Sequence, residues 1–442
     1  MPEGPLLVVG LARSGQAVAR MLAVTGRQVV AVDAAAPDGA AGLTEVGVEV
    51  VLDVDGTEFL DRVKTLVKSP GVPGDAAVIG AARERGIAVV GELDLAWRAL
   101  PNAFVAVTGT NGKTTVVEWL AHVWEQAGLE AVAAGNVGTP LSSLVGRLDE
   151  DATVICECSS FQLEDAVAFA PEIAVLLNVT PDHIDRHRSF DAYRDAKLRI
   201  FTGQGEGDYS IFDADEVSFA ASDRPGDGAT IAYGASACAE GGCLVRIRGE
   251  AIEADGRPLV ALEELALPGR HNARNAMAVT AAALCAGLPV DAIARGLREF
   301  GGVPHRLESV GEHRGVRYIN DSKATNVAAA GAALRAFDGG VHVILGGSLK
   351  GGGFEALAPA VEQTCRAAYL IGEAASTLRR ALQSTSVELR DCETLEAAVG
   401  AAAAAASPGE TVLLAPACAS FDAFDDYEHR GRRFRELVRG LG

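Results

Sequence analysis

The chain has 442 residues, of which 49% are hydrophobic and only 5% aromatic, so it is too long for one core and should form two or three domains. Its formal charge of −20 comes from 59 acidic against 39 basic side chains, which argues against a nucleic-acid or anionic-membrane partner. Any small anionic ligand must therefore be held by local lysines, arginines and N–H groups.

The eight cysteines include no Cys-x-x-Cys pair, and Cys156, Cys158, Cys285 and Cys418 lie in apolar runs. This usage favours buried, reduced thiols over a disulfide framework. No basic segment precedes an apolar stretch at the N-terminus, and no apolar run is long enough to span a bilayer. We therefore expect a cytoplasmic protein without membrane contact.

The N-terminal segment predicts a dinucleotide-binding layout. An apolar strand, a glycine turn from Gly10 to Gly15 and a helix are followed by a second strand that ends in Asp33. An acidic residue about twenty positions past the turn is typical of this layout. Ala12 replaces the glycine that lets a pyrophosphate approach the backbone, which weakens an NAD site and favours a nucleotide held differently. The rigid loop Ser69-Pro70-Gly71-Val72-Pro73 should lie at the same ligand-binding edge.

A phosphate-binding loop is predicted at Gly109-Thr110-Asn111-Gly112-Lys113-Thr114-Thr115, between the apolar run Phe104–Val107 and a segment of helical period. A strand, a glycine turn and a helix start direct N–H groups and the helix dipole at one anion, and a nucleotide phosphate fits best. Lys113 would reach the outer phosphates, and Thr114 would hold Mg²⁺. The spacing is shorter than Gly-x-x-x-x-Gly-Lys-Ser/Thr, and the alternative is a tight turn with a solvated lysine.

Strands and helices alternate through the rest of the chain. Up to about residue 300 the pattern predicts a mostly parallel sheet covered on both faces, with antiparallel edge strands from Tyr209 to Leu265. Gly301-Gly302-Val303-Pro304 cannot continue a helix. We predict a three-domain α/β protein: a Rossmann-like domain over 1–99, a central ATPase-like domain of P-loop type over 100–302, and a Rossmann-like domain over 303–442.

Glu157 ends a predicted strand beside the phosphate loop, where its carboxylate could bind Mg²⁺ together with Thr114. Ser159-Ser160-Phe161-Gln162-Leu163-Glu164 then turns into a helix. The alternative is that Ser159 or Ser160 caps this helix while Glu164 is solvated, and both interpretations can hold together.

Other polar residues have more than one interpretation. The loop from Asn178 to His187 contains two histidines and two aspartates, and could be a zinc site, a helix cap or a solvated turn, although zinc lacks a third His or Cys. Lys197 could be an ordinary surface base of an amphipathic helix. Asn272, Asn275 and Ser420 could be helix caps, and Lys350 could be a solvated loop charge.

The phosphate loop resembles the ATP loop of the Mur ligase superfamily, which includes the folylpolyglutamate synthases. The stretch from Glu157 to Glu164 resembles the Glu-Leu-Ser-Ser-Phe-Gln-Leu-Glu of MurD-type ligases, with Cys158 in place of Leu. Residues 415–424 resemble their Ser-Pro-Ala-Cys-Ala-Ser-x-Asp-x-Phe tail. Ala415 replaces a serine there, which should matter little, whereas Phe421 replaces a smaller aliphatic residue and could reshape the amino-acid pocket.

This resemblance implies an activity. Mur ligases use ATP to turn a carboxylate into an acyl phosphate, which the amine of an amino acid attacks. The MurD-type members add D-glutamate to UDP-MurNAc-L-Ala in peptidoglycan precursor synthesis. The resemblance therefore implies ATP, two Mg²⁺ ions and these two small-molecule substrates, and we expect a monomer.

The resemblance also implies residue roles. The expected catalytic residues are Lys113, Glu157, His183 and Lys197, with Lys197 carbamylated. The expected Mg²⁺ ligands are Thr114, Glu157, His183 and Lys197. The expected ATP contacts are Gly109, Thr110, Asn111, Gly112, Lys113, Thr114, Thr115, Asn275, Arg306, Asp321 and Lys323. The expected substrate contacts are Arg13, Ser14, Gly15, Asp33, Gly71, Asn136, Ser159, Gln162, Thr325, Lys350, Ser420 and Phe421.

Among the substrate contacts, Asp33 would read the uracil, while Lys350, Ser420 and Phe421 would hold the glutamate side chain with support from Thr325. The base that takes the proton of the incoming amine is left unassigned, because the metal role of His183 competes.

Rival functions stay open. A nucleotide-regulated binding protein would show no glutamate-dependent ATP hydrolysis. A folylpolyglutamate-type synthase would not need a first domain ending in Asp33. An enzyme of another Mur step would differ in its substrates, and a dehydrogenase would need NAD at the turn that Ala12 weakens.

Overall fold

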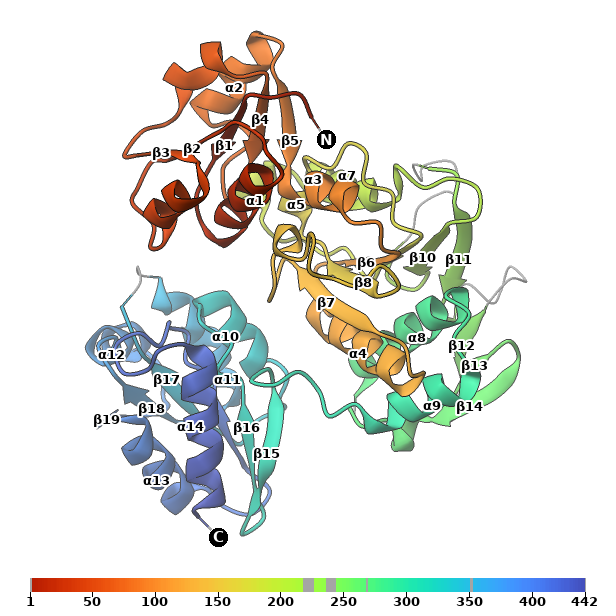
Figure 1. Cartoon of the computed structure of the whole chain (residues 1–442). Helices are drawn as coiled ribbons and strands as arrows, with labels where there is room; N and C mark the ends of the chain where they lie inside the picture. The colour runs from red at the N-terminus through yellow and green to blue at the C-terminus, as the bar shows by residue number, and fades with distance from the viewer. Residues whose placement is uncertain (1, 218–225, 236–243, 268, 350–352, 442) are drawn as a thin grey trace. The chain divides into compact units, whose positions relative to one another are not determined.

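The computed structural model describes residues 2–217, 226–235, 244–267, 269–349 and 353–441. Its internal contacts divide the chain into two units, Met1–Gly301 and Gly302–Gly442 (Figure 1). The first unit contains two sheets and the second unit contains one. The domain boundaries at residues 99/100 and 302/303 stay predictions.

The first sheet has five parallel strands in the order β3-β2-β1-β4-β5 (Figure 1). Its elements are β1 (Leu6–Val9), α1 (Arg13–Val24), β2 (Val29–Asp33), β3 (Glu49–Leu52), β4 (Thr65–Lys68), α2 (Ala77–Glu84), β5 (Ala88–Gly91) and α3 (Glu92–Ala99). In β1, Leu6 and Val8 pack into one core and Leu7 and Val9 into another, which is why the strand reads as continuously apolar. The strand order reverses between β1 and β4, so Gly10 after β1 lies at the edge where sheets of this kind bind ligands, as the Rossmann-like prediction requires.

The second sheet has nine strands in the order β14-β13-β12-β11-β10-β9-β6-β8-β7. The strands are β6 (Phe104–Thr108), β7 (Ala131–Gly135), β8 (Thr153–Glu157), β9 (Ile173–Leu176), β10 (Tyr209–Asp213), β11 (Ala229–Tyr233), β12 (Val245–Arg248), β13 (Ala251–Ala254) and β14 (Arg257–Ala261). The predicted antiparallel pairing is right for β12 to β14 but wrong for β10 and β11, which pair in parallel. The polar residues of these segments suggested exposed edge strands. In the structure, however, Ser210 of β10 is buried, and its hydroxyl donates a hydrogen bond to the Gln204 side chain.

The helices of this sheet include α4 (Lys113–Gln126), α5 (Ser160–Leu163), α6 (Ile184–His187), α7 (Phe190–Leu198), α8 (Arg270–Cys285) and α9 (Val290–Glu299). Trp119 anchors α4, because its indole N–H donates to the Gly296 carbonyl at 3.0 Å and its ring stacks on Phe300. A Cβ at Gly296 would lie 2.6 Å from Val123 Cγ2, so only glycine allows α9 this close to α4. Trp124, also buried, donates to the Thr153 hydroxyl. The helix that begins at Lys113 is therefore firmly packed.

Buried charged groups attach the first sheet to the second. Lys68 Nζ at the end of β4 lies 2.6 Å from Asp165 Oδ2, with side chains 0% and 5% exposed. Glu92 accepts hydrogen bonds from the N–H and the hydroxyl of Ser142, and Asp94 accepts one from the N–H of Ala168. Both acids open α3, so this helix is bonded into the second half of the unit.

The second unit has a six-stranded sheet in the order β15-β16-β20-β17-β18-β19, in which only the edge strand β15 is antiparallel within the described part. Its elements are β15 (Glu308–His313), β16 (Val316–Asn320), α10 (Val327–Leu334), β17 (Val341–Gly346), α11 (Ala358–Thr364), β18 (Cys365–Ile371), α12 (Ala375–Leu382), β19 (Glu388–Glu393), α13 (Leu395–Ala405), β20 (Thr411–Leu414) and α14 (Tyr427–Arg439). Alternate residues of β17 enter cores on both faces, as in the predicted α/β domain.

Among the helices of the described ranges, none combines the length and the apolar composition that crossing a membrane requires.

The contact between Lys68 and Asp165 generates a stability prediction. Burial raises the pKa of Asp165 in spite of the lysine, so desolvation outweighs the attraction between the two charges. We expect Asp165→Asn to lower the free energy of unfolding by about 3 kcal/mol, because it leaves the ammonium buried without a carboxylate. The double variant Lys68→Met/Asp165→Leu should recover most of that loss.

Urea unfolding followed by circular dichroism would measure both variants against the wild type. A double variant as unstable as Asp165→Asn would contradict this account of the pair.

Candidate active site

The phosphate loop depends on two glycines. A Cβ at Gly109 would lie 3.0 Å from Leu177 Cβ, and one at Gly112 would lie 2.7 Å from Asn275 Oδ1. Gly112 also has φ +85° and directly precedes α4. The loop therefore passes close to the end of β9 and to α8, and Asn275 lies against it. The interpretation of Asn275 as a cap is wrong, since α8 follows Gly269 and no side chain caps it.

Asn178 braces the loop from the next strand, a role that the sequence did not reveal. Its Oδ1 accepts from the N–H of Asn111 at 2.8 Å, and its Nδ2 donates to the Asn111 carbonyl at 3.1 Å. Its own carbonyl accepts from the N–H of Thr110. An asparagine directly after a strand beside the loop was the available signal.

Two lysines share one carbonyl of the loop. Lys113 Nζ donates to the carbonyls of Gly109 and Thr110 at 2.9 and 3.0 Å, and Lys197 Nζ donates to that of Gly109 at 2.7 Å. Lys197 is 2% exposed, so its interpretation as a surface base is wrong. Burial first, and then the charge of Lys113, lowers the pKa of Lys197 to about 7. A large fraction of this side chain is therefore a neutral amine near neutral pH.

Glu157 supplies a carboxylate oxygen that could bind a cation. β8 pairs with β6, and Glu157 lies opposite Val107, just before the loop. Its Oε1 accepts from Asn136 Nδ2 at 2.9 Å, while its buried Oε2 has no hydrogen-bond partner among the described residues. A buried, unbonded carboxylate oxygen fits Mg²⁺, and the buried Thr114 at the start of α4 is a second possible ligand.

The thiols of Cys156 and Cys158, on either side of Glu157, lie 3.5 Å apart and are fully buried. Both are free, as are the other cysteines within the described ranges.

The two histidines of the loop after β9 differ in exposure. His183 has φ +50°, its side chain is 51% exposed, and its Nε2 lies 3.6 Å from Asp182 Oδ2. His187 is buried, hydrogen-bonds Ser160 and stacks on Phe161, and burial lowers its pKa. His183 is therefore the one available to a ligand. Among the described side chains, no three His, Cys, Asp or Glu residues form a metal cluster, so the zinc interpretation has no support.

Tyr193 joins these parts and was not singled out from the sequence. Its hydroxyl lies 2.9 Å from Thr110 Oγ1, and its ring contacts His183, His187 and the ammonium of Lys197. Its position one helical turn before Lys197 on α7 was the available signal.

Ser159 and Gln162 form a capping box at the start of α5, which confirms the cap alternative for Ser159. Their substrate contacts stay predictions.

The first sheet presents the predicted nucleotide turn. A Cβ at Gly15 would lie 1.8 Å from the Gly10 carbonyl, so this glycine allows close helix packing. Asp33 accepts from the N–H groups of Leu11 and Ala35 and so shapes the turn. Its contact with uracil stays a prediction, as do those of Ser14 and the exposed Gly71. Arg13 reaches the loop after β7, where its Nη2 donates to the Gly138 carbonyl at 2.9 Å.

In the second unit, Asp321, Lys323 and Thr325 follow β16, and Ser420 and Phe421 follow β20. Asp321 accepts from the N–H of Leu307, and burial raises its pKa to about 6. Ser420 is 1% exposed and Phe421 is 64% exposed. The cap interpretation of Ser420 is wrong, because a turn follows it and Asp426 caps α14.

The backbones of Lys323 and Thr325 continue the loop after β16, where the N–H of Lys323 donates to the His305 carbonyl. Their ligand contacts and that of Arg306 stay predictions. Lys350 lies outside the described residues.

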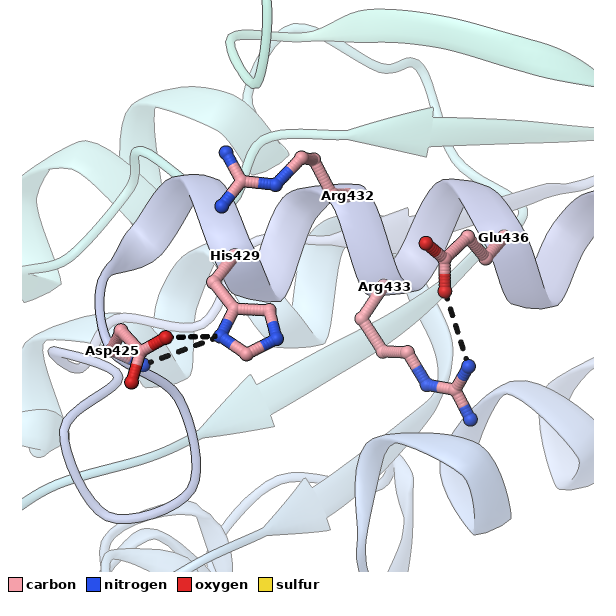
Figure 2. Close-up of a pocket in the computed structure, with 5 residues that line it drawn as sticks. All are labelled: Asp425, His429, Arg432, Arg433 and Glu436. Atoms are coloured by element: carbon pink, nitrogen blue, oxygen red, sulfur yellow. Dashed lines mark hydrogen bonds and ion pairs between the residues drawn. The ribbon is translucent and has the colours of Figure 1, made fainter.

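A surface pocket of about 260 Å³ lies elsewhere in this unit, along α14, and is lined by Asp425, His429, Arg432, Arg433 and Glu436 (Figure 2). Figure 2 shows His429 directed at Asp425 and Arg433 directed at Glu436. Arg432 lies near Glu428. Since its cations are already paired and none of the predicted site residues lines it, we assign it no role.

The glycine packing generates a prediction with a matched control. We expect Gly112→Ala to destabilise the loop and to impair nucleotide binding, because it combines an unfavourable φ with a collision against Asn275. Gly128→Ala is the control, since Gly128 has φ +73° after the same helix but open space around its Cβ position. Thermal unfolding and nucleotide titration should separate the two variants. Equal behaviour would show that the collision with Asn275 is unimportant.

Three family models match the chain: the MurD-like N-terminal domain over residues 5–91, the Mur ligase middle domain over 107–283 and the Mur ligase glutamate ligase domain over 305–418. The UDP-N-acetylmuramoylalanine–D-glutamate ligase of Acidobacterium capsulatum is 40% identical over 441 residues, which are 98% of this chain and 95% of that one.

Two solved structures share the fold. They are UDP-N-acetylmuramate–alanine ligase from Thermotoga maritima (TM-score 0.58, 19% identity, 99% of each chain) and MurF ligase from Thermotoga maritima in complex with ADP (TM-score 0.54, 17% identity, 94% of this chain and 96% of that one). Family models over all three sheets, together with a near-full-length relative, establish the family. The chain belongs to the Mur ligase family, in its MurD-like branch of D-glutamate ligases.

Proposed function

We propose that the chain is an ATP-dependent ligase that joins D-glutamate to UDP-N-acetylmuramoyl-L-alanine through an acyl phosphate, in peptidoglycan precursor synthesis. The observation that carries this is the phosphate loop with Lys113 and Lys197 on one carbonyl, next to the strand that ends in the unbonded carboxylate oxygen of Glu157. The 40% identity to a D-glutamate ligase over nearly the whole chain supports the substrate pair.

The first step brings two anions together, the alanine carboxylate of the substrate and the γ-phosphate of ATP. Lys113 would reduce their repulsion and stabilise the charge that develops during in-line transfer. To do so its ammonium would exchange a bond to the loop carbonyls for phosphate oxygens. Mg²⁺, when bound, would neutralise phosphate charge, with Thr114 and Glu157 as ligands of one ion and His183 and Lys197 as ligands of the other.

We also propose that Lys197 is carbamylated. An ammonium would repel Mg²⁺, whereas a carbamate offers anionic oxygens that suit a hard cation. Only a neutral amine adds CO₂, with formation of the N–C bond and loss of a proton, and the pKa of about 7 supplies that form.

The remaining contacts follow from the family resemblance. Asn275, Arg306, Asp321 and Lys323 are proposed for ATP. Arg13, Ser14, Gly15, Asp33, Gly71, Asn136, Ser159 and Gln162 are proposed for the UDP substrate, and Thr325, Lys350, Ser420 and Phe421 for D-glutamate. We propose a cytoplasmic monomer that acts on small molecules, with no nucleic-acid or membrane partner. The group that takes the proton of the amine stays unassigned.

Phosphate release from ATP tests the function. We expect release only when UDP-MurNAc-L-Ala and D-glutamate are both present, because acyl-phosphate formation without the amine stops after one turnover. Lys113→Ala should lower turnover by about a thousandfold while leaving the fold intact, since it removes charge stabilisation and two loop hydrogen bonds but no core contact.

Lys64→Ala is the control for this experiment, because Lys64 is an exposed lysine paired with Glu3. Release that ignores D-glutamate, or full activity of Lys113→Ala, would overturn the proposal. Release with a folate-type acceptor in place of the UDP substrate would favour the folylpolyglutamate alternative.

Lys197 has a direct spectroscopic test. Carbon-13 bicarbonate should give a carbamate signal in the wild-type protein, and Lys197→Gln should lose it, because burial lowers the pKa of this amine to about 7 and so makes its reactive neutral form accessible. Lys64→Gln should keep the signal. An unmodified Lys197 amine in a high-resolution structure with Mg²⁺ and nucleotide bound would refute carbamylation.

A further inference from the structure

Arg430, in the first turns of α14, is a buried cation whose guanidinium donates four hydrogen bonds to neutral acceptors. Arg430 is only 1% exposed. Nε donates to Ser322 Oγ at 3.0 Å, and Nη1 donates to the Ala419 carbonyl at 3.1 Å. Nη2 donates to the carbonyls of Ser322 and Cys418 at 2.9 and 3.1 Å. Every one of these acceptors is an uncharged oxygen.

Burying the charge of Arg430 costs desolvation free energy, and packing alone would not require a charged side chain here. Burial lowers the pKa of Arg430 to about 10, so the group stays charged at neutral pH although water has been removed from it. Apolar side chains often replace buried charges without loss of stability. The planar guanidinium offers something that an apolar side chain cannot, namely several donors in a fixed fork that can hold two backbone segments at once.

The two segments that Arg430 holds are the loops that leave adjacent parallel strands. Ser322 follows β16, between Asp321 and Lys323, and Cys418 and Ala419 follow β20, directly before Ser420. Arg430 therefore bonds to backbone next to the residues proposed for ATP and to backbone next to those proposed for D-glutamate.

The neighbouring Gly431 extends this contact to a third segment. Its carbonyl accepts from Asn320 Nδ2 at 3.3 Å, and a Cβ at this position would lie 2.1 Å from His305 Nδ1. Asn320 Nδ2 also lies 2.9 Å from His305 Nδ1. One turn of α14 thus contacts the segments that carry Arg306, Asp321 and Ser420.

We propose that Arg430 is a positioning residue, which holds the loops after β16 and β20 in the relative register that ATP and D-glutamate require. The inference rests on the proposed function of these loops. Arg430 itself touches neither substrate, and it acts by fixing the backbone from which the binding groups project.

The main test is Arg430→Lys, which keeps the charge but replaces the fork by a single ammonium. We expect the KM for D-glutamate and the KM for ATP each to rise by about tenfold or more, because misplaced binding groups lose affinity steeply. The KM for UDP-MurNAc-L-Ala should stay within about twofold, because its proposed contacts lie in the first unit.

Arg433→Lys is the control on the same helix. Its side chain, labelled in Figure 2, is 40% exposed and pairs with Glu396 and Glu436. All its constants should match the wild type. A purely structural Arg430 would lower the melting temperature of Arg430→Lys and leave the three KM values unchanged, and that result would overturn the proposal.

A milder variant covers the case in which Arg430→Lys does not fold. Ser322→Ala removes the Nε bond and the Ser322 bond to the Tyr427 carbonyl, while leaving the two Nη2 carbonyl bonds possible. We expect the same two KM values to rise, by less. An unchanged KM for both substrates would overturn the proposal.

Hydrogen exchange separates this inference from the proposed function. In Ser322→Ala, the N–H groups of residues 320–324 and 417–421 should exchange faster than in the wild type, whatever the protein catalyses. If the wild type releases no phosphate with both substrates, the proposed function is wrong, but the exchange rates of these two segments still test whether Arg430 fixes them. Unchanged exchange in both segments would show that Arg430 does not fix them.

Discussion

The carbonyl oxygen of Gly109 accepts hydrogen bonds from two lysines, and the arrangement of the first unit's site depends on this shared acceptor. Two ammonium groups on one carbonyl repel each other, and burial first, and then this repulsion, lowers the pKa of Lys197 to about 7. In a chain of formal charge −20, Lys113 is thus a positive group held locally by the loop.

Local features could be predicted from the sequence, because they depend on neighbours in the chain. The glycine loop before Lys113, the apolar parallel strands and the capping box at Ser159 are of this kind. Contacts between distant segments could not be predicted, because they depend on the order of the strands in the sheet. Asn178 bonds to the backbone of the phosphate loop in this way, and Arg430 bonds to the loops after β16 and β20. The polar composition of a strand was also a misleading guide to its place in the sheet, since β10 contains a serine but is an inner, parallel strand.

Both units hold separate chain segments together with buried charged side chains, but the charge differs in sign. In the first, buried acids such as Glu92 and Asp94 accept hydrogen bonds from backbone N–H groups and join two sheets. In the second, a buried base, Arg430, donates to backbone carbonyls and joins two loops. In both units a charge is buried against the backbone, where removal of a single partner leaves an unsatisfied group. Such contacts favour one relative placement over its near alternatives.

The burial of Trp119 and Trp124 in α4 also determines which part of this protein intrinsic tryptophan fluorescence can monitor. The chain has three tryptophans, at positions 97, 119 and 124, and all of them belong to the first unit. Two of them lie in the helix that starts at the phosphate loop, with their rings buried. Intrinsic tryptophan emission therefore follows the first unit, through α3 for one ring and through α4 for two, while residues 302–442 contain no tryptophan. Fluorescence and far-ultraviolet ellipticity recorded on one sample would consequently resolve the two units as separate transitions wherever their stabilities differ.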